Sequence, residues 1–113
     1  MKKSKVTSHI LDIELGKPAS DVMIKLELLD NENWKVLGEA KTDSDGRVID
    51  WLNADLVPGQ YRISFGVKDY FSRQNRECFY PNVSIDFLLK NLDEHFHVPL
   101  LLSSHGYSTY RGS

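Results

Sequence analysis

The sequence predicts an all-β protein, a sandwich of two antiparallel sheets. Short runs alternate apolar and polar side chains with a period of two, as strands with one buried face do. The clearest of these runs are residues 22–28, 61–65 and 83–87. Turn-forming residues punctuate the chain at 16–18, 30–33, 43–46, 58–59 and 81–82. Strands this short and evenly spaced are typical of a sandwich rather than of β–α–β units.

One short helix is expected around residues 69–77. Asp69 suits the N-cap, and Tyr70, Phe71 and Gln74 would fall near one face. A helix of this length depends on packing rather than on intrinsic propensity. On the residue pattern alone, a loop is an open alternative for this segment.

The composition excludes several functional classes. With 113 residues and a formal net charge of −2, residues 1–113 have the size of a single domain, and their basic residues are scattered. Cys78 is the only cysteine and cannot form an internal disulfide. The chain shows neither a signal-peptide pattern nor an apolar run long enough to cross a bilayer. We therefore expect a cytoplasmic protein that binds neither nucleic acid nor membrane. A small-molecule site would lie on its surface or between subunits.

Two polar side chains occupy positions where the backbone would fix their direction. His9 shares one face of a predicted strand with Thr7. Arg47 directly follows an Asp-Gly turn at 45–46, so it begins the next strand. Taken singly, each residue fits a structural role better than a catalytic one.

The C-terminal stretch has two different faces. Its apolar face consists of Phe96, Val98, Leu100 and Leu102. The opposite face carries His95, His97, Pro99, Leu101 and Ser103. A face of mixed polarity suits a subunit interface or a ligand channel better than contact with water alone. Aromatic residues and an arginine continue to the chain end at 107–113, which indicates that this end is docked.

Several segments together resemble the 5-hydroxyisourate hydrolases, the enzymatic branch of the transthyretin-like proteins. They are SHILDIELGKPASDV, TDSDGR, the FYP at 79–81 and HVPLLLS…GYSTYRGS, in family order across 6–113. The closing YRGS is the most specific, because the hormone-carrying transthyretins lack both it and the paired histidines. The resemblance implies a transthyretin-like two-sheet β-sandwich of about eight strands with one short helix. It also implies a homotetramer, a dimer of dimers, with sites in the channel where the dimers meet.

The resemblance further assigns the site residues. The catalytic positions correspond to His9, Arg47 and His97. The substrate-binding positions correspond to Ser103, Tyr110, Arg111, Gly112 and Ser113. No metal or other cofactor is implied. The chain departs from the family at 104–105, where Ser-His replaces the usual proline and aromatic residue.

The implied substrate is 5-hydroxyisourate, the first product of urate oxidation, which is hydrolysed to an imidazoline. Opening its cyclic amide-like ring needs an activated water, a stabilised oxyanion and a proton for the leaving nitrogen. We expect His9 or His97 to activate the water, and the other to orient it or protonate the nitrogen. Arg47 would stabilise the developing charge with its fork of donors.

Three other functions fit parts of the pattern. A transthyretin-like carrier of a small hydrophobic ligand would have the same fold, but it needs an apolar slot. A zinc hydrolase could use His9, His95 and His97, although no carboxylate or cysteine joins them at ligand spacing. An interaction domain with incidental histidines explains each residue singly, but not their occurrence together with YRGS.

Overall fold

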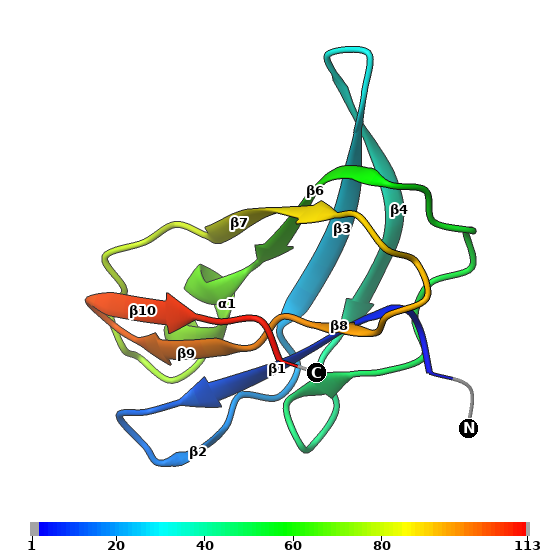
Figure 1. Ribbon diagram of the computed structural model, residues 1–113. Helices are drawn as coiled ribbons and strands as arrows, with labels where there is room; N and C mark the ends of the chain where they lie inside the picture. The colour runs from blue at the N-terminus through cyan, green and yellow to red at the C-terminus, as the bar shows by residue number, and fades with distance from the viewer. Residues whose placement is uncertain (1–2, 113) are drawn as a thin grey trace.

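The computed structural model describes residues 3–112, which contain ten strand segments and one helix. The strands are β1 (Val6–Asp12), β2 (Lys17–Pro18), β3 (Met23–Asp30), β4 (Asn33–Lys41), β5 (Arg47–Val48), β6 (Gly59–Phe65), β7 (Val83–Leu89), β8 (Phe96–His97), β9 (Leu100–Ser103) and β10 (Gly106–Thr109). The helix is α1 (Val67–Ser72). The strands form two facing sheets (Figure 1). One sheet has the order β4-β3-β6-β7, and the other has β10-β9-β1-β2, with β5 and β8 also paired to β1.

The predicted all-β, two-sheet sandwich with one short helix is confirmed. The strand segments outnumber the expected eight or so because β2, β5 and β8 contain two residues each. β8 and β9 are parts of one predicted run, interrupted between them at Val98 and Pro99. Proline has no backbone N–H to give to a ladder, which explains the break at this point.

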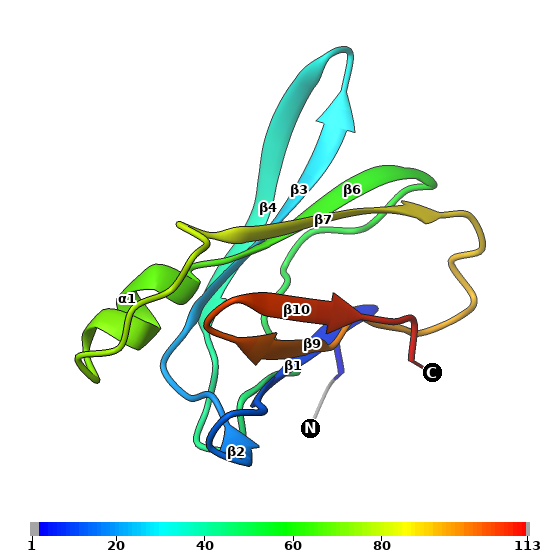
Figure 2. The same ribbon diagram turned by 90° about the vertical axis from the view of Figure 1, so that its left-hand side faces the viewer.

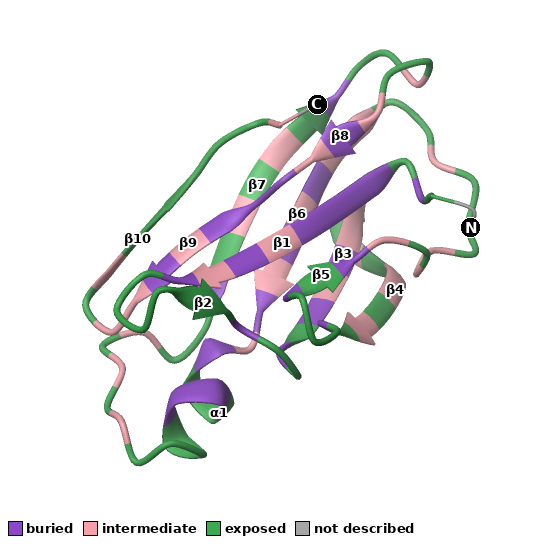
Figure 3. Cartoon of the chain, turned by 90° about the horizontal axis from the view of Figure 1, so that it is seen from below, coloured by how far each residue is buried: buried purple, intermediate pink, exposed green. Residues whose placement is uncertain are grey.

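The core lies between the two sheets, which Figure 2 shows edge-on. The predicted apolar face of the C-terminal stretch belongs to it: Phe96, Val98, Leu100 and Leu102 are all buried. The opposing sheet contributes Ile24, Leu26, Tyr61, Ile63 and Phe65. Each fully buried side chain of this kind stabilises the fold by about 1.5–3 kcal/mol. Figure 3 shows the resulting alternation of buried and less buried residues along β1 and β9.

The helix differs from the prediction in its bounds. It begins two residues before Asp69, which lies in the first turn and does not cap the helix. Gly66 holds the N-cap position and provides no side-chain cap. Val67, Tyr70 and Phe71 are buried, so packing against the core decides where the helix begins. No helix within residues 3–112 is long and apolar enough to cross a membrane.

A buried carboxylate joins the end of β1 to the helix. Asp12 is fully buried and accepts hydrogen bonds from Tyr70 Oη at 2.7 Å and from Arg76 Nη1 at 2.7 Å. Burial alone would raise the pKa of Asp12, but the bonds from Arg76 and Tyr70 outweigh it and lower the pKa. The ion pair therefore fixes β1, the strand that positions the candidate site.

Candidate active site

β1 is the strand on which the candidate site is assembled. Along one edge it pairs with β8 in parallel, which places Thr7 beside His97. Along the other edge it pairs antiparallel with β5, which places His9 beside Arg47. Figure 3, seen from below, shows β1 between these neighbours. Three segments far apart in the sequence thus bring their polar side chains to one outer face.

The turn before Arg47 fixes the direction of its side chain. The Asp43 carboxylate accepts hydrogen bonds from the N–H groups of Asp45 at 2.9 Å and Arg47 at 3.0 Å. Gly46 has a φ of +76°, and a Cβ there would lie 2.6 Å from the carbonyl oxygen of Ile10. Only glycine fits this approach to β1. The Asp-Gly signal therefore corresponds to a constrained turn that delivers Arg47 beside His9.

His97 is held by a hydroxyl on its inner side. Its Nδ1 lies 2.9 Å from Thr7 Oγ1, and the same oxygen lies 3.1 Å from His95 Nε2. The other ring nitrogen of His97, Nε2, has no hydrogen-bond partner among residues 3–112. This nitrogen is thus available to a substrate or a water molecule.

The polar side chains surround a small hollow of about 140 Å³. Its lining includes Lys3, Thr7, Arg47, His95 and His97. Arg47 is exposed, and within the described range no carboxylate lies at salt-bridge distance from it. A guanidinium without an acidic partner beside open imidazole nitrogens can receive a planar, carbonyl-rich molecule.

His9 and His97 both favour the neutral form of the imidazole ring. Burial lowers the pKa of His97 below its ordinary value, and the positive charge of Arg47 lowers it further. Burial and Arg47 also lower the pKa of His9, against the opposing influence of the backbone of Asp45. Neutral imidazoles at pH 7 can accept a proton from water, as a general base must.

The C-terminal tail reaches the site at Gly112. Its N–H donates to the carbonyl oxygen of His97 at 2.7 Å, in an isolated bridge to β8. A Cβ at this position would lie 2.9 Å from His97 Cδ2, so the glycine packs directly on the imidazole. The N–H of His97 returns a longer bond to Gly112 at 3.5 Å. Figure 1 shows the segment after β10 approaching β8.

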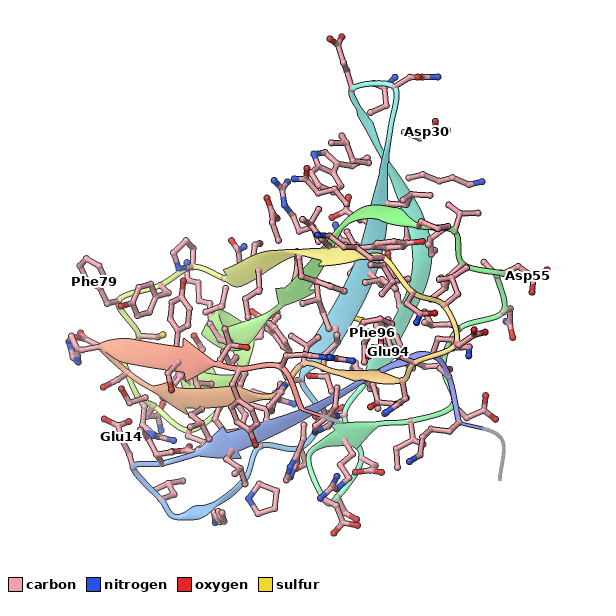
Figure 4. All side chains as sticks on the ribbon, in the orientation of Figure 1. Glu14, Asp30, Asp55, Phe79, Glu94 and Phe96 are labelled. Atoms are coloured by element: carbon pink, nitrogen blue, oxygen red, sulfur yellow. The ribbon has the colours of Figure 1, made fainter. Side chains whose placement is uncertain are left out.

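The two residues before Gly112 do not line the hollow at His97, although Arg111 Nη2 donates to the backbone carbonyl oxygen of His95 at 3.4 Å. Arg111 Nη2 donates to Glu94 at 3.1 Å, and its guanidinium lies 4.8 Å from the ring centroid of Phe96. Figure 4 labels both partners, which lie close together in this view. Tyr110 and Arg111 line a second hollow of about 480 Å³ between β7 and β10, together with Leu88 and Phe96. Ser113 lies outside the described residues.

Ser103 is also separate from the imidazoles within one chain. Its hydroxyl donates to the carbonyl oxygen of Gly106 at 3.0 Å and closes the β9–β10 turn. Six residues of extended chain place it roughly 20 Å from His97. In the same turn, Ser104 Oγ donates to Glu14 at 2.8 Å and lies 2.9 Å from His105 Nδ1. The departure from the family pattern thus connects this turn to the β1–β2 turn.

Comparison with known proteins identifies the family. A sequence profile of the HIUase/Transthyretin family matches residues 6–112. The chain belongs to this family. A 5-hydroxyisourate hydrolase of Caulobacter vibrioides is 45% identical over 114 residues, covering 97% of this chain and 99% of the relative.

Two solved structures that resemble this chain are a hydrolase and a transthyretin. A 5-hydroxyisourate hydrolase of Klebsiella pneumoniae has a TM-score of 0.83 at 34% identity, covering 96% of this chain and 98% of that one. Sea bream transthyretin in complex with thyroxine has a TM-score of 0.90 at 26% identity, covering 96% of this chain and 95% of that one. The higher TM-score belongs to the transthyretin and the higher identity to the hydrolase. The fold therefore does not discriminate between the functions, and the side chains of the site must do so.

The cluster has the wrong geometry for the metal alternative. Within residues 3–112, no group of three or more histidine, cysteine, aspartate or glutamate side chains is placed to hold a metal ion. His95 Nε2 and His97 Nδ1 both approach the hydroxyl of Thr7, which engages one ring nitrogen of each histidine. Three converging ligands, which a catalytic zinc requires, are absent from this part of the chain.

The family resemblance assigns His9, Arg47 and His97 to the site; Arg47 and His97 line the hollow, and His9 pairs with Arg47 beside it. The sequence pattern does not reveal the residue that connects His95 with His97, because it shows Thr7 only as a neighbour of His9 on one face. Its spacing from His9 could have suggested a role, yet its partners lie 88 and 90 residues away in the sequence. The pairing of Arg111 with Glu94 was likewise invisible to a local pattern.

Proposed function

We propose that the chain is a 5-hydroxyisourate hydrolase, which opens the six-membered ring of 5-hydroxyisourate to give an imidazoline product in urate breakdown. The observation that carries this proposal is the Nε2 of His97, on an imidazole whose pKa is lowered, beside the guanidinium of Arg47; neither group has a partner among residues 3–112. A carrier of an apolar ligand has no need of these groups, whereas hydrolysis of a cyclic amide uses both. The family membership and the relatives named as this hydrolase support the same reading.

In this proposal, His97 acts as the general base. Its Nε2 takes a proton from a water molecule, whose oxygen attacks the ring carbonyl. Arg47 donates hydrogen bonds to the carbonyl oxygen as negative charge develops on it. His9, beside Arg47, orients the water or protonates the leaving nitrogen. No metal or cofactor takes part in these steps.

We also propose that the working form is a homotetramer, a dimer of dimers. One chain offers only the hollow of about 140 Å³, whereas sites for small molecules are typically about 300–1,000 Å³. β7 and β10 are edge strands with unpaired backbone groups, and the larger hollow between them exposes Leu88 and Tyr110. Such an edge is a ready surface for pairing with another chain.

Within the tetramer, a neighbouring chain would supply the substrate-binding residues that do not line the hollow at His97. Ser103, Tyr110 and Arg111 are the candidates, since none of them lines this hollow in its own chain. Gly112 contacts His97 directly, and Ser113 follows it. We place the whole chain, residues 1–113, in one hydrolase domain of the cytoplasm, where a lone Cys78 needs no disulfide partner.

The test is a direct assay of turnover. 5-Hydroxyisourate is generated from urate with urate oxidase, and its decay is followed by ultraviolet absorbance with and without the protein. We expect acceleration by the wild type and a loss of about 10²–10⁴-fold in the His97→Ala variant. Circular dichroism of both proteins establishes equal folding. A folded wild type that leaves the decay unchanged would contradict the proposal.

A carrier of a small hydrophobic ligand is the second candidate. Its support is the apolar hollow beside Tyr110 and the fold likeness to a thyroxine complex. Tight binding of thyroxine by a protein that shows no turnover would favour this function. The polar hollow at His97 would then have no use, which is why we place the hydrolase first.

A further inference from the structure

The hydroxyl of Thr7 lies between two imidazoles. Thr7 is 4% exposed, and its Oγ1 is 2.9 Å from His97 Nδ1 and 3.1 Å from His95 Nε2. A hydroxyl has one proton and two lone pairs, so it donates to at most one of the rings and accepts from the other or from both. The two histidines therefore cannot both present an unprotonated nitrogen to Thr7.

Two arrangements of protons place the hydroxyl proton between the rings, and in a third the hydroxyl accepts from both rings and directs its own proton elsewhere. In the first, His97 carries its proton on Nδ1 and donates it to Thr7, which donates its own to His95. The Nε2 of His97 then has a lone pair directed away from Thr7. In the second, Thr7 donates to His97 Nδ1, and the proton of the neutral ring is on Nε2. The first arrangement, unlike the second, makes His97 a base at Nε2.

We propose that Thr7, with His95 as its second partner, is a positioning residue that holds His97 in the tautomer whose Nε2 accepts a proton. The inference rests on the proposed function, in which that nitrogen activates water. His95 gives the Thr7 hydroxyl an acceptor, so the hydroxyl oxygen is left to accept from His97 Nδ1–H. His95 does not contact the reacting atoms in this scheme.

Packing alone does not explain a threonine at this position. Valine has nearly the same shape and an equally high preference for strands. The hydroxyl of Thr7 bonds no backbone group among residues 3–112, and both of its partners are imidazole rings. Its polar contacts thus serve the orientation of the two histidines and not the ladder of β1.

The first experiment compares turnover of 5-hydroxyisourate by three variants. Thr7→Val should lower kcat by roughly 10- to 100-fold, as loss of a group that orients a functional histidine does, with little change in KM. Thr7→Ser restores the hydroxyl and should recover most of kcat. Thr42→Val is the matched control, because the buried hydroxyl of Thr42 also makes two hydrogen bonds, to Val22 N–H and Ala19 O. It should lower the melting temperature without lowering kcat.

The second experiment reads the tautomer itself, without turnover. Nitrogen NMR of protein labelled with ¹⁵N-histidine distinguishes protonated from unprotonated ring nitrogens, and single-histidine substitutions assign the four rings. We expect His97 to be protonated on Nδ1 in the wild type. Thr7→Val should shift the proton toward Nε2, and His95→Phe should act in the same direction. The double variant should be no slower than the slower single variant, because the two residues act as one unit.

The outcomes separate the two proposals. A wild type without turnover overturns the function, and the nitrogen shifts still decide whether Thr7 sets the tautomer. An active wild type whose kcat and His97 tautomer survive Thr7→Val overturns the role of Thr7 and leaves the function standing. If the Thr7→Val protein does not fold, Thr7→Ser and His95→Phe decide the question. A His97 ring that is protonated on Nε2 in a fully active wild type contradicts the inference. Full activity together with an unshifted His97 tautomer in His95→Phe contradicts it as well.

Discussion

At the scale of single residues, the tail glycine has a specific steric role. Gly112 lies against the His97 ring, where an added Cβ would come within 2.9 Å of Cδ2 and 3.1 Å of Cβ. Gly112→Ala should displace the tail and lower kcat by up to about 10²-fold, since small misplacements in an active site have effects of this size. Gly106→Ala is the control, because its Cβ would meet only Ser103 Oγ, at 3.6 Å. Equal activity of both variants would argue against a tail that closes the site.

The lowered pKa values of His9 and His97 predict the pH dependence of the reaction. His97 must be neutral to act as the general base, so the acid limb of kcat/KM should have its midpoint below the ordinary histidine value of about 6.5. Between the lowered values and 6.5, the unfolded chain binds more protons than the folded one. Stability therefore rises with pH through this window and is reduced below it. A limb centred above 6.5 would contradict the assignment.

Arg47 is one cause of the lowered pKa of His97, second to burial. Arg47→Gln removes the positive charge and should raise the pKa of His97, which proton NMR titration of the imidazole measures directly. Arg62→Gln is the control, since Arg62 pairs with Asp86 on the other sheet. A shift of equal size in both variants would show a nonspecific effect of net charge.

At the scale of elements, the turn of the β3–β4 hairpin contains backbone strain that a substitution can relieve. Its two-residue turn has φ values of +48° at Asn31 and +71° at Glu32, in the left-handed region. Figure 4 labels Asp30 beside this turn, which projects beyond the sandwich. Glu32→Gly should raise the free energy of unfolding by about 1 kcal/mol, because a side chain is disfavoured there.

Denaturant unfolding measures this gain, and the turnover assay should be unchanged. The control is Glu39→Gly, an exposed position within β4 where glycine lowers stability by roughly 0.5–1 kcal/mol. A loss of stability in both variants would show that the turn is not strained.

The ion pair between Asp12 and Arg76 joins two elements. Asp12 is fully buried, so Arg76→Ala leaves an uncompensated carboxylate and should cost about 3–5 kcal/mol of stability. Arg73→Ala removes the neighbouring arginine, which pairs with the exposed Asp21, and should cost at most about 1 kcal/mol. Urea unfolding of the two variants checks the difference. Equal losses would mean that the burial of Asp12 is not decisive.

The sequence predicts those features that depend on neighbours along the chain and misses those that depend on distant contacts. The core face of the C-terminal strand and the turn before Arg47 depend on neighbours along the chain, so alternation and the Asp-Gly pair predict them. The start of the helix depends on how Val67 packs, so the prediction of an N-cap at Asp69 was wrong. The contact of Thr7 with His97 depends on a parallel register between β1 and β8, which no local pattern encodes.

At the scale of the whole molecule, the proposed assembly makes turnover depend on a surface other than the hollow at His97. Leu88 is 60% exposed on the edge strand β7 and lines the apolar hollow beside Tyr110. Leu88→Asp places a charge there, which should split the tetramer into smaller species and abolish most turnover. Sedimentation velocity gives the assembly state, and the 5-hydroxyisourate assay gives the activity.

Val36→Asp tests the opposite edge of the same sheet. Val36 is 48% exposed on β4, so it receives the same charge in a comparable setting away from the hollow. We expect this variant to keep both assembly and turnover. An intact tetramer in Leu88→Asp would move the interface elsewhere. A fully active monomer would show that the residues around His97 in one chain are sufficient, and that Tyr110 and Arg111 of a neighbour are not required.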